Sequence, residues 1–501
     1  MFLRYSTALS LVLLFWLTPE SLSRCCGQET ASEADYYPIV RFQIPEELNV
    51  EASAVELLPG ATAAADRVAV ATRRGDIFLI DGAFQDDPSK VTFKLFAQGL
   101  HEVLGLHEKD GWMYVTQRCD VTRLKDTDND DVADTFEIFS DGWEISGDYH
   151  EYAFGSDFDA DGNMWVTLCL TGSFNSDVKY RGWCLRIDED GKVMPTCGGI
   201  RSPGGIGFNA KGDTFYTDNQ GPWNGTCSLK WLRPGSFQGH PGGNKWYDIA
   251  KDFIGDAPKE PTSGSRMMTE AALIPEYEPP AILFPYQKMG QSASGFACDQ
   301  TKGKFGPFQD QLFVGDVTHS LVMRCFLEEV DGHYQGACFP FRSDLGSGTL
   351  ALEFGTDGTL IAGGTNRGWG SRGTKSFAVE RLQWSGKIPF EIKTMEAKRN
   401  GFRLTMTKPV DSKSALNMDS WTWQSYTYIF QSSYGSPEVD HRQPKMTDIK
   451  ISDDGLQIDV TLDQMQIGHV HELVATGLKS KDGQPLLHPE AYYTLNYLPK
   501  N

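Results

Sequence analysis

The stretch GDYHEYAFGSDFDADGNMWVT, residues 147–167, decides the fold. Its second half has an Asp161-Gly162 turn and then an apolar run, the pattern of a hairpin turn followed by a strand. Its first half places His150 shortly before the strands begin. In a closed ring of sheets, loops before strands gather around a common axis, where ligands are usually bound. The stretch therefore predicts both a strand repeat and a candidate functional residue.

The unit of a polar turn and a short apolar strand occurs six times. The copies are RGDIFLID (74–81), DGWMYVTQ (110–117), DGNMWVTL (161–168), KGDTFYTD (211–218), QDQLFVGD (309–316) and DGTLIAGG (357–364). Aligned on Phe78, Tyr114, Trp165, Phe215, Phe313 and Leu360, they are spaced by 36, 51, 50, 98 and 47 residues. A period near fifty is typical of propeller blades. It predicts an all-β, six-bladed β-propeller over residues 39–384, with an insertion at 221–291.

A different pattern follows Trp384. FRLTMT (402–407) and LQIDVTL (456–462) alternate apolar and polar residues, and turns rich in Gly and Asp separate the segments. Short alternating strands of this kind predict a C-terminal immunoglobulin-like β-sandwich over residues 385–501. His469 and His471 share one face of a strand there, and we expect both to face solvent.

The N-terminal residues and the charge bear on location and partners. A basic start, an apolar run over 8–17 and small residues after it predict a cleaved signal peptide at 1–27, and the acidic residues 28–38 predict a disordered segment. The apolar run is too short to span a bilayer, so we expect no transmembrane segment and a secreted or periplasmic protein. The net charge of −21 argues against a nucleic acid or an anionic membrane as a partner.

Two pairs of cysteines have a spacing that suits disulfides. Cys184 and Cys197 lie symmetrically about Asp190-Gly191, and Cys325 and Cys338 lie symmetrically about Asp331-Gly332. Two-residue hairpin turns at these positions would place each pair directly opposite, where a cross-strand disulfide forms in an oxidising compartment. The alternative is two pairs of buried thiols. The sequence does not assign partners to Cys119, Cys169, Cys227 and Cys298.

The segment DTDNDDVADTFE, residues 126–137, has the ligand spacing of a calcium loop. The candidate ligands are the carboxylates of Asp126, Asp128, Asp130, Asp134 and Glu137 and the carbonyl of Val132. They fall at loop positions 1, 3, 5, 9, 12 and 7. Asp131 stands at position 6, where such loops have Gly. Because strands flank the segment, we expect a structural calcium site, with a solvated acidic hairpin as the alternative.

Few residues suit acid-base chemistry, since the chain has only 10 histidines. His150 has Asp148 and Glu151 beside it, and a carboxylate could orient its imidazole. Arg201, in GGIRSPGGIGF, precedes another blade strand and could hold an anionic group. The alternatives are a histidine that packs a loop and an arginine on the surface.

The order of these motifs resembles one known family. A histidine before a blade strand, the LRIDEDG hairpin, RSPGGIGF, DNQGP and PGSFQGHP follow one another as in the soluble pyrroloquinoline-quinone (PQQ)-dependent glucose/sorbosone dehydrogenases. The resemblance covers about residues 99–384 and looks closest to secreted planctomycete-type members. It implies a sugar or polyol substrate, PQQ and calcium as cofactors, and a periplasmic electron acceptor.

The resemblance also implies roles for individual residues. His150 would be the general base that takes the hydroxyl proton, and Arg201 would contact the quinone, with Ser202 where the family usually has Asn. Gly221 and Pro222 would match the loop that supplies carbonyls to a calcium beside the cofactor. The sequence departs from the family where 345–350 reads LGSGTL in place of an arginine-rich stretch. Arg342, Arg367 and Arg372 are the candidate replacements.

Three functions are compatible with this sequence. The first is a secreted quinoprotein-like oxidoreductase that acts on a sugar or polyol. The second is a calcium-dependent lactonase or related hydrolase on the same ring. The third is a non-catalytic propeller that binds carbohydrate or protein. Propellers host all three, so the fold alone does not decide among them.

Overall fold

The computed structural model describes residues 31–170, 175 and 177–500. The predicted signal peptide, 1–27, lies outside the described residues. Among the described residues, no helix combines the length and apolar character needed to cross a membrane.

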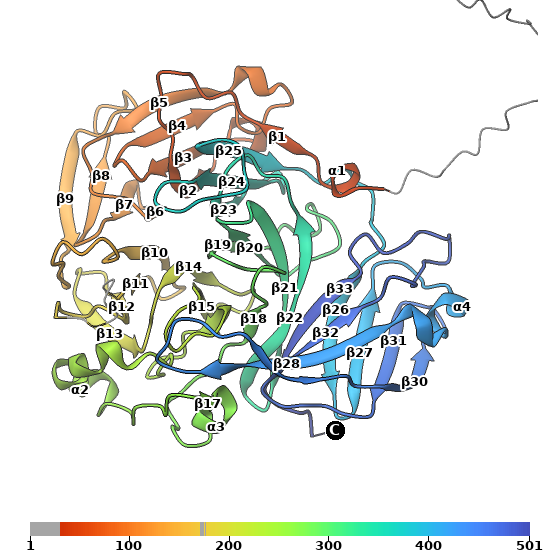
Figure 1. The fold of residues 1–501 in the computed structure, drawn as a ribbon. Coiled ribbons are helices and arrows are strands. Elements are labelled where there is room, and N and C mark those ends of the chain that lie inside the picture. Colours follow the sequence, from red (N-terminus) through yellow and green to blue (C-terminus); the bar gives the residue numbers. More distant parts are fainter. Residues whose placement is uncertain (1–30, 171–174, 176, 501) are drawn as a thin grey trace, which may run out of the picture. The chain divides into compact units, whose positions relative to one another are not determined.

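Six blades of four antiparallel strands form the larger part of the molecule (Figure 1). Five of them are separate sheets, and blade 5 is part of a nine-stranded sheet. From the innermost strand outward, blade 1 is β2 (Ala52–Leu58), β3 (Arg67–Thr72), β4 (Ile77–Asp81) and β5 (Thr92–Ala97), and blade 2 is β6 (Gly105–Lys109), β7 (Trp112–Thr116), β8 (Val121–Lys125) and β9 (Thr135–Ser140). Blade 3 is β10 (Ala153–Phe158), β11 (Met164–Leu168), β12 (Trp183–Ile187) and β13 (Val193–Gly198), and blade 4 is β14 (Pro203–Phe208), β15 (Thr214–Asp218), β16 (Cys227–Trp231) and β18 (Ile282–Phe284). Blade 5 is β19 (Ala293–Cys298), β20 (Leu312–Asp316), β21 (Leu321–Val330) and β22 (His333–Arg342), and blade 6 is β23 (Thr349–Phe354), β24 (Leu360–Thr365), β25 (Phe377–Leu382) and β1 (Ile39–Arg41).

The ring is closed by the first strand of the chain. β1 pairs with β25, with Ile39 opposite Leu382, so blade 6 takes its outer strand from the N-terminal side and its other three from the end of the repeat. Each innermost strand contacts the innermost strand of the next blade, and β23 contacts β2. The second strands are almost wholly buried, as in β11 and β15, and supply apolar side chains to the layers between blades. The predicted all-β propeller is confirmed.

The structure explains the uneven spacing of the sequence repeat. Five of the six aligned residues lie on the second strand of a blade, but Phe78 lies on β4, the third strand of blade 1. The first interval is short because Phe78 lies one strand further along its blade than the other five residues do.

The predicted insertion at 221–291 is wrong in its bounds. β16 and β18 are regular strands of blade 4, and only the chain between them leaves the sheet. This excursion contains η3 (Pro241–Trp246), α2 (Tyr247–Ile254), β17 (Ser265–Arg266) and α3 (Met267–Ala271). Short 3-10 turns, η1 (Ala63–Ala65) and η2 (Pro88–Lys90), lie in blade 1.

The C-terminal residues form two sheets around one core. One sheet has the order β26 (Ile392–Lys398), β27 (Gly401–Met406), β31 (Gln457–Leu462) and β30 (Met446–Ile451). The other has β28 (Thr422–Phe430), β32 (His469–Val474) and β33 (Glu490–Leu495), with β29 (Glu438–Arg442) beside β28; α4 (Ser412–Ala415) and η4 (Met418–Ser420) precede β28. Phe402 of the first sheet stacks on Trp423 of the second at 5.5 Å. We call this part the C-terminal module.

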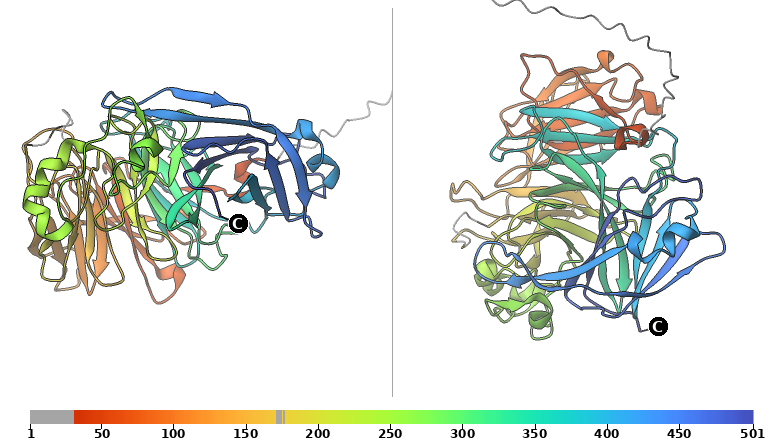
Figure 2. Two further views of the ribbon diagram at one scale, coloured as in Figure 1. Left: turned by 90° about the horizontal axis from the view of Figure 1, so that it is seen from below. Right: turned by 45° about the vertical axis from the view of Figure 1, so that its right-hand side comes forward.

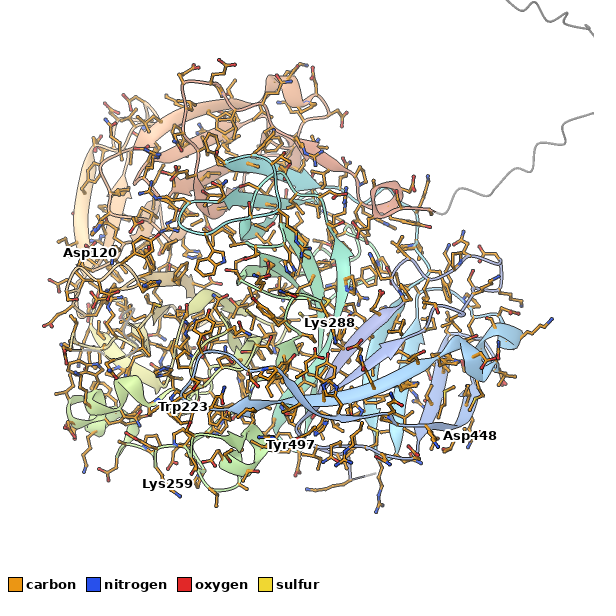
Figure 3. The ribbon with its side chains drawn as sticks, viewed as in Figure 1. Asp120, Trp223, Lys259, Lys288, Asp448 and Tyr497 are labelled. Carbon is orange, nitrogen blue, oxygen red and sulfur yellow. The ribbon has the colours of Figure 1, made fainter. Side chains whose placement is uncertain are left out.

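The C-terminal module shares a sheet with the propeller. β33 pairs with β22, so blade 5 continues into the C-terminal strands, and β28 pairs with β17 of the blade 4 excursion. Lys288, labelled in Figure 3, reinforces this junction through ion pairs with Glu438 (2.9 Å) and Glu472 (2.8 Å). The hairpin of β28 and β29 extends from the blue C-terminal strands over the propeller (Figure 2, left).

Two expectations for the ends of the chain are corrected. Residues 33–36, within the segment predicted to be disordered, form α1 (Glu33–Tyr36), because Tyr36 and Tyr37 are buried and Glu33 binds Arg342 at 3.1 Å. His469 and His471, expected to face solvent, are also buried. β32 lies between β28 and β33 with both faces covered, so the alternation along it does not mark a solvent face.

Candidate functional site

The candidate functional site is a pocket of about 210 Å³ at the end of the ring where the innermost strands begin. These strands contribute Phe154, Gly204, Ala293, Ser294 and Leu350 from their first residues. The first residues after the second strands of blades 1, 3, 4 and 5 contribute Arg73, Cys169, Asn219 and Val317, and the second residue after β24 of blade 6 contributes Arg367. Five blades therefore meet at this pocket, as expected for a ligand site on a propeller axis.

The structure brings His150 and Arg201 into this one pocket, together with Ser202. His150 lies at the mouth, with about half of its side chain exposed, and its Nδ1 is 3.8 Å from Oδ1 of Asp148. The same carboxylate oxygen accepts a hydrogen bond from the backbone N–H of His150 at 2.9 Å. Asp148 is thus placed to orient the imidazole, whereas Glu151 turns away and binds Ser146.

Arg201 lies deeper, between blades 3 and 4. Its Nη1 donates to the carbonyl of Asn219 at 3.4 Å, and its guanidinium lies 5.3 Å from the ring of Tyr434. A Cβ on Gly221 would lie 2.3 Å from the guanidinium carbon, so only glycine leaves room for Arg201 in this position. The resemblance to the family points to the carbonyl of Gly221 as a calcium ligand. In the structure Gly221 matters because it lacks a side chain and so leaves room for Arg201.

The carbonyl of Gly221 is already used within the protein. It accepts hydrogen bonds from the backbone N–H groups of Asn224 and Gly435, both at 3.1 Å. Neither Gly221 nor Pro222 is among the described residues that line the pocket. The structure therefore does not place these two residues as ligands of a calcium beside a cofactor.

A buried ion pair supports the Arg201 side of the pocket. Oδ2 of Asp218 accepts from Nζ of Lys230 at 2.9 Å, and Oδ1 accepts from the backbone N–H of Ser202 at 2.8 Å. Burial alone would raise the pKa of Asp218, but the Lys230 ammonium and the Ser202 N–H lower it. Asp218 therefore stays ionised and fixes the backbone beside Arg201.

Arg73 and Tyr152 form the opposite wall. Nη2 of Arg73 donates to Oε1 of Glu102 and to the hydroxyl oxygen of Tyr152, both at 3.0 Å. Burial raises the pKa of the Tyr152 phenol, which therefore remains protonated. Arg367, the one candidate replacement arginine found among the lining residues, pairs with Glu51 at 3.2 Å. Arg342 instead binds Glu33 beside α1.

The rim of the pocket is aromatic. Tyr149, Trp369 and Tyr434 line it from three separate loops, and each is about half exposed. Tyr434 belongs to the β28–β29 hairpin, so the C-terminal module contributes to the site. Among the described lining residues there is no carboxylate. The arrangement can hold a planar or ring-shaped ligand that carries oxygen atoms or negative charge.

The cysteine pairs have the predicted register but are thiols in this structure. Cys184 lies opposite Cys197 and Cys325 opposite Cys338, and all eight cysteines of the described residues are free. The first turn differs from the prediction, because Asp188 caps a longer loop by accepting from the N–H groups of Asp190 and Lys192. A bulge after Cys184 restores the alignment. The disulfides stay predictions. Cys169 lines the pocket, where burial raises its pKa to about 11.

The acidic loop forms only part of the predicted calcium site. Asp126, Asp128 and Asp130 offer oxygens within 4.8 Å of one another, and Asp131 at the position usually taken by Gly has a φ of +64°. Glu137 is not turned to this cluster: it lies in β9 and pairs with Arg123 of β8 at 2.7 Å. An exiting strand, unlike an exiting helix, does not fold the twelfth residue back over the loop. Asp134 instead accepts from Thr127 at 2.7 Å, and Val132 is exposed.

Sequence reasoning missed Arg73, Tyr152, Trp369 and Tyr434, and it named Arg367 only as one of three candidate replacement arginines. A usable signal was the position directly after the second strand, which reaches the pocket in four blades, while in blade 6 the next residue does so. It would have pointed to Arg73 and to the neighbourhood of Arg367. No repeat signal could have found Tyr434, because it comes from the C-terminal module.

The ring of six blades and the pocket at its axis define the molecule as a β-propeller with an axial ligand site. The chain belongs to the family described as Domain of unknown function (DUF7133), whose model matches residues 81–343. No curated protein matches its sequence.

Solved structures with a similar fold include three bacterial proteins. One, from Thermus thermophilus and assigned as an oxidoreductase (glucose dehydrogenase), is 18% identical with a TM-score of 0.50, and the match covers 69% of this chain and 99% of that one. The PQQ-bound aldose sugar dehydrogenase of Streptomyces coelicolor is 13% identical, with a TM-score of 0.46 and coverage of 69% and 97%. The soluble aldose sugar dehydrogenase of Escherichia coli, in its apo-form, is 13% identical, with a TM-score of 0.48 and coverage of 69% and 99%. At these identities the first similarity supports the fold alone.

Proposed function

We propose that this protein is a secreted quinoprotein-like oxidoreductase that oxidises a hydroxyl group of a sugar or polyol with PQQ. The observation that carries the proposal is that His150 and Arg201, chosen separately from the sequence, line one pocket on the propeller axis. A candidate base and a candidate anion-binding group so placed are what a hydroxyl oxidation needs.

The residues of the pocket fit a planar polycarboxylate such as PQQ. Arg73, Arg201 and Arg367 supply guanidinium groups, which bind carboxylates through paired hydrogen bonds. Asn219 and Gln220 add polar groups on the same side as Arg201, and no carboxylate among the described lining residues would repel the ligand. The chemistry that PQQ supplies when bound is acceptance of a hydride from the substrate carbon.

The protein's own residues would prepare the substrate. His150 would accept the hydroxyl proton at its imidazole, with Asp148 holding the ring in place. Tyr152, kept protonated by burial, would donate its hydroxyl hydrogen to the ligand while its oxygen accepts from Arg73. Arg201 would hold an oxygen of the cofactor, since Gly221 and Asn219 fix its position. Phe154 and Leu350 would keep water from the inner end of the pocket.

Two alternatives remain open to experiment. A calcium-dependent lactonase would need oxygen ligands for the metal at the pocket, and the described lining residues include no carboxylate, which favours the oxidoreductase. A non-catalytic propeller would bind a ligand without turnover and would make His150 dispensable.

The test uses purified protein with PQQ and calcium. We expect an absorbance change for bound PQQ and reduction of a redox dye with at least one member of a sugar and polyol panel. Arg201→Ala should weaken PQQ binding by about 100-fold, and His150→Ala should abolish dye reduction while PQQ still binds. Arg186→Ala is the matched control, because Arg186 packs on Trp165 away from the pocket. Acid release from lactones without dye reduction would support the hydrolase instead. The absence of both activities would support the non-catalytic binding protein.

Three further features belong to the proposal. We take the Asp126–Asp130 cluster to bind a structural calcium ion, which its crowded carboxylates support. We take the C-terminal module to be an immunoglobulin-like sandwich, since two sheets enclose one core. We take the protein to be exported, with a periplasmic electron acceptor, on the strength of the N-terminal sequence.

A further inference from the structure

The aromatic rim of the pocket exposes an unusual amount of ring surface. Tyr149 and Trp369 are each 51% exposed and Tyr434 is 57% exposed. The three side chains come from loops of blade 3, blade 6 and the C-terminal module, and they converge on one opening. Large exposed aromatic groups that converge on a pocket are typical of a binding surface.

Tyr434 is held in place by the backbone of its hairpin. The hairpin binds blade 4 through the hydrogen bonds Gly435 N–H to Gly221 O (3.1 Å), Ser436 N–H to Gly225 O (3.0 Å) and Trp223 N–H to Gln431 O (2.7 Å). Phe430 adds a stacked contact with Tyr277 at 5.4 Å. Figure 3 labels Trp223 at this junction, where β28 reaches the propeller. None of these contacts uses the Tyr434 side chain, so its ring can serve a ligand while its position is fixed.

The other rings are positioned as firmly. The hydroxyl of Tyr149 packs against Gly368, where an added Cβ would lie 2.2 Å away, and its ring meets that of Tyr152 edge to face at 5.6 Å. Nε1 of Trp369 donates to Oγ1 of Thr318 at 3.0 Å. A rim fixed before the ligand arrives loses little entropy on binding.

We propose that this rim binds the units of a carbohydrate chain that lie outside the pocket, and that Tyr434 is a specificity residue added by the C-terminal module. The C–H face of a pyranose packs on an aromatic ring, whose π face is electron-rich. Asn219, Gln220 and Gln291 lie beneath the rim, and each amide makes a hydrogen bond within the protein. Their remaining donor and acceptor positions suit hydroxyl groups, which a lipid or another wholly apolar ligand does not offer. The ligand is therefore an oligosaccharide whose end unit enters the pocket. The inference rests on the proposed function only in taking a sugar as the substrate class.

The experiment measures binding without turnover. The full chain is titrated calorimetrically, without PQQ, with glucose and with cello-, malto- and xylo-oligosaccharides of two to four units. We expect affinity in one series to rise at least tenfold from one unit to three. Tyr434→Ala and Trp369→Ala should each remove most of that gain, and Tyr434→Phe should keep it, because the ring is retained. Phe253→Ala, an exposed aromatic side chain on α2, is the control and should change nothing.

The outcomes separate this inference from the proposed function. Affinity that does not depend on chain length, no binding of any series, or full gain in Tyr434→Ala would each overturn the inference, even if the protein reduces dye with a monosaccharide. A chain-length gain that depends on Tyr434, in a protein that never reduces dye, would support the inference and reject the oxidoreductase.

Discussion

Two cavities lie along the innermost strands and are lined by different charged groups, arginines at one end and carboxylates with a histidine at the other. Where the innermost strands begin, Arg73, Arg201 and Arg367 line the pocket. A second cavity of about 90 Å³ shares Phe154 and Leu350 with the pocket and lies further along these strands.

The second cavity is lined by acidic groups and one histidine. His107 lies 3.4 Å from Glu56 and 4.0 Å from Asp157, and Glu353 lies on β23, which contacts the strand of Glu56. Burial raises the pKa of Asp157 to about 6, and burial together with Glu56 raises that of Glu353 to about 8. Burial alone would lower the pKa of His107, but the two carboxylates beside it raise it to about 9.

This difference shows how charge is balanced in each place. Arg73 pairs with Glu102 and Arg367 with Glu51, and neither carboxylate lines the pocket. These ion pairs stabilise the two guanidinium groups and leave them facing the pocket. At the second cavity Glu56, Asp157 and Glu353 lie near a single histidine. The negative charge that His107 does not offset is reduced by protonation, since the pKa of Glu353 is raised. The first end therefore suits an anion at neutral pH, as the proposed function requires, whereas the charges of the second end bear on stability.

The largest expected effect tests the cationic end. Arg201→Ala should weaken binding of PQQ, or of another planar polycarboxylate, by about 100-fold, since a charge-assisted hydrogen bond contributes roughly 1.5–3 kcal/mol. Spectroscopic titration of the variant beside Arg186→Ala measures this. If both variants bind as the wild type does, the pocket is not the anion site, and the comparison of the two ends fails.

The sequence predicts the ring better than it predicts these two ends. The turn-strand repeat marks the second strands, because their burial demands apolar residues at a regular spacing. The pocket is built largely from the residues just after those strands, which are of different types in each blade, so the repeat does not identify them. His150 and Arg201 are candidates from their sequence neighbours, and the resemblance adds Ser202 and, as a replacement arginine, Arg367. Glu56 and Glu353 lie on innermost strands whose alternation is broken by bulges, between Ala52 and Ala54 and between Thr349 and Ala351. His107 lies on β6, which pairs regularly with β7 but carries no copy of the turn-strand repeat. Tyr434 depends on the pairing of β28 with β17, which links residues far apart in sequence.

A second prediction tests the acidic end through pH. The pKa of Glu353 is raised on folding, so its contribution to stability is complete below the unfolded value near 4.5 and is lost as pH rises to about 8. His107 acts in the same direction between 6.5 and about 9. Glu353→Gln removes the loss of stability that ionisation of Glu353 causes. It should therefore stabilise the protein by about 1–3 kcal/mol at pH 8, after allowance for water in the cavity.

Urea unfolding at pH 5 and pH 8 measures the effect of Glu353→Gln. The exposed Glu47→Gln serves as control and should show no pH-dependent difference. Equal stability of Glu353→Gln and the wild type at both pH values would mean that the carboxylate is well solvated, and the acidic end would then need no protonation to balance it.

A third, smaller effect separates the position of Arg201 from its charge. Gly221→Ala keeps every charge but places a methyl group 2.3 Å from the guanidinium carbon. We expect binding of PQQ to weaken about tenfold while the free energy of unfolding changes by less than about 1 kcal/mol, because the end of an arginine side chain moves easily. Gly370→Ala is the control, since an added Cβ meets no atom within 4 Å there. Wild-type binding by Gly221→Ala would show that the anion needs Arg201 only as a diffuse charge.

The smallest expected effect concerns the acidic loop between β8 and β9 of blade 2. Asp126, Asp128 and Asp130 are exposed or half-buried, so unlike the carboxylates of the second cavity they do not need protons to remain in the fold. Repulsion by Asp130 raises the pKa of Asp128, and a calcium ion would relieve that repulsion. Saturating calcium should raise the melting temperature by a few degrees, as expected for a ligand that binds only the folded state. Differential scanning calorimetry should find this rise in the wild type and in Asp190→Asn, a change in another exposed hairpin turn, and not in Asp126→Asn. An equal rise in all three proteins would place the calcium elsewhere, and the loop would then be a solvated hairpin.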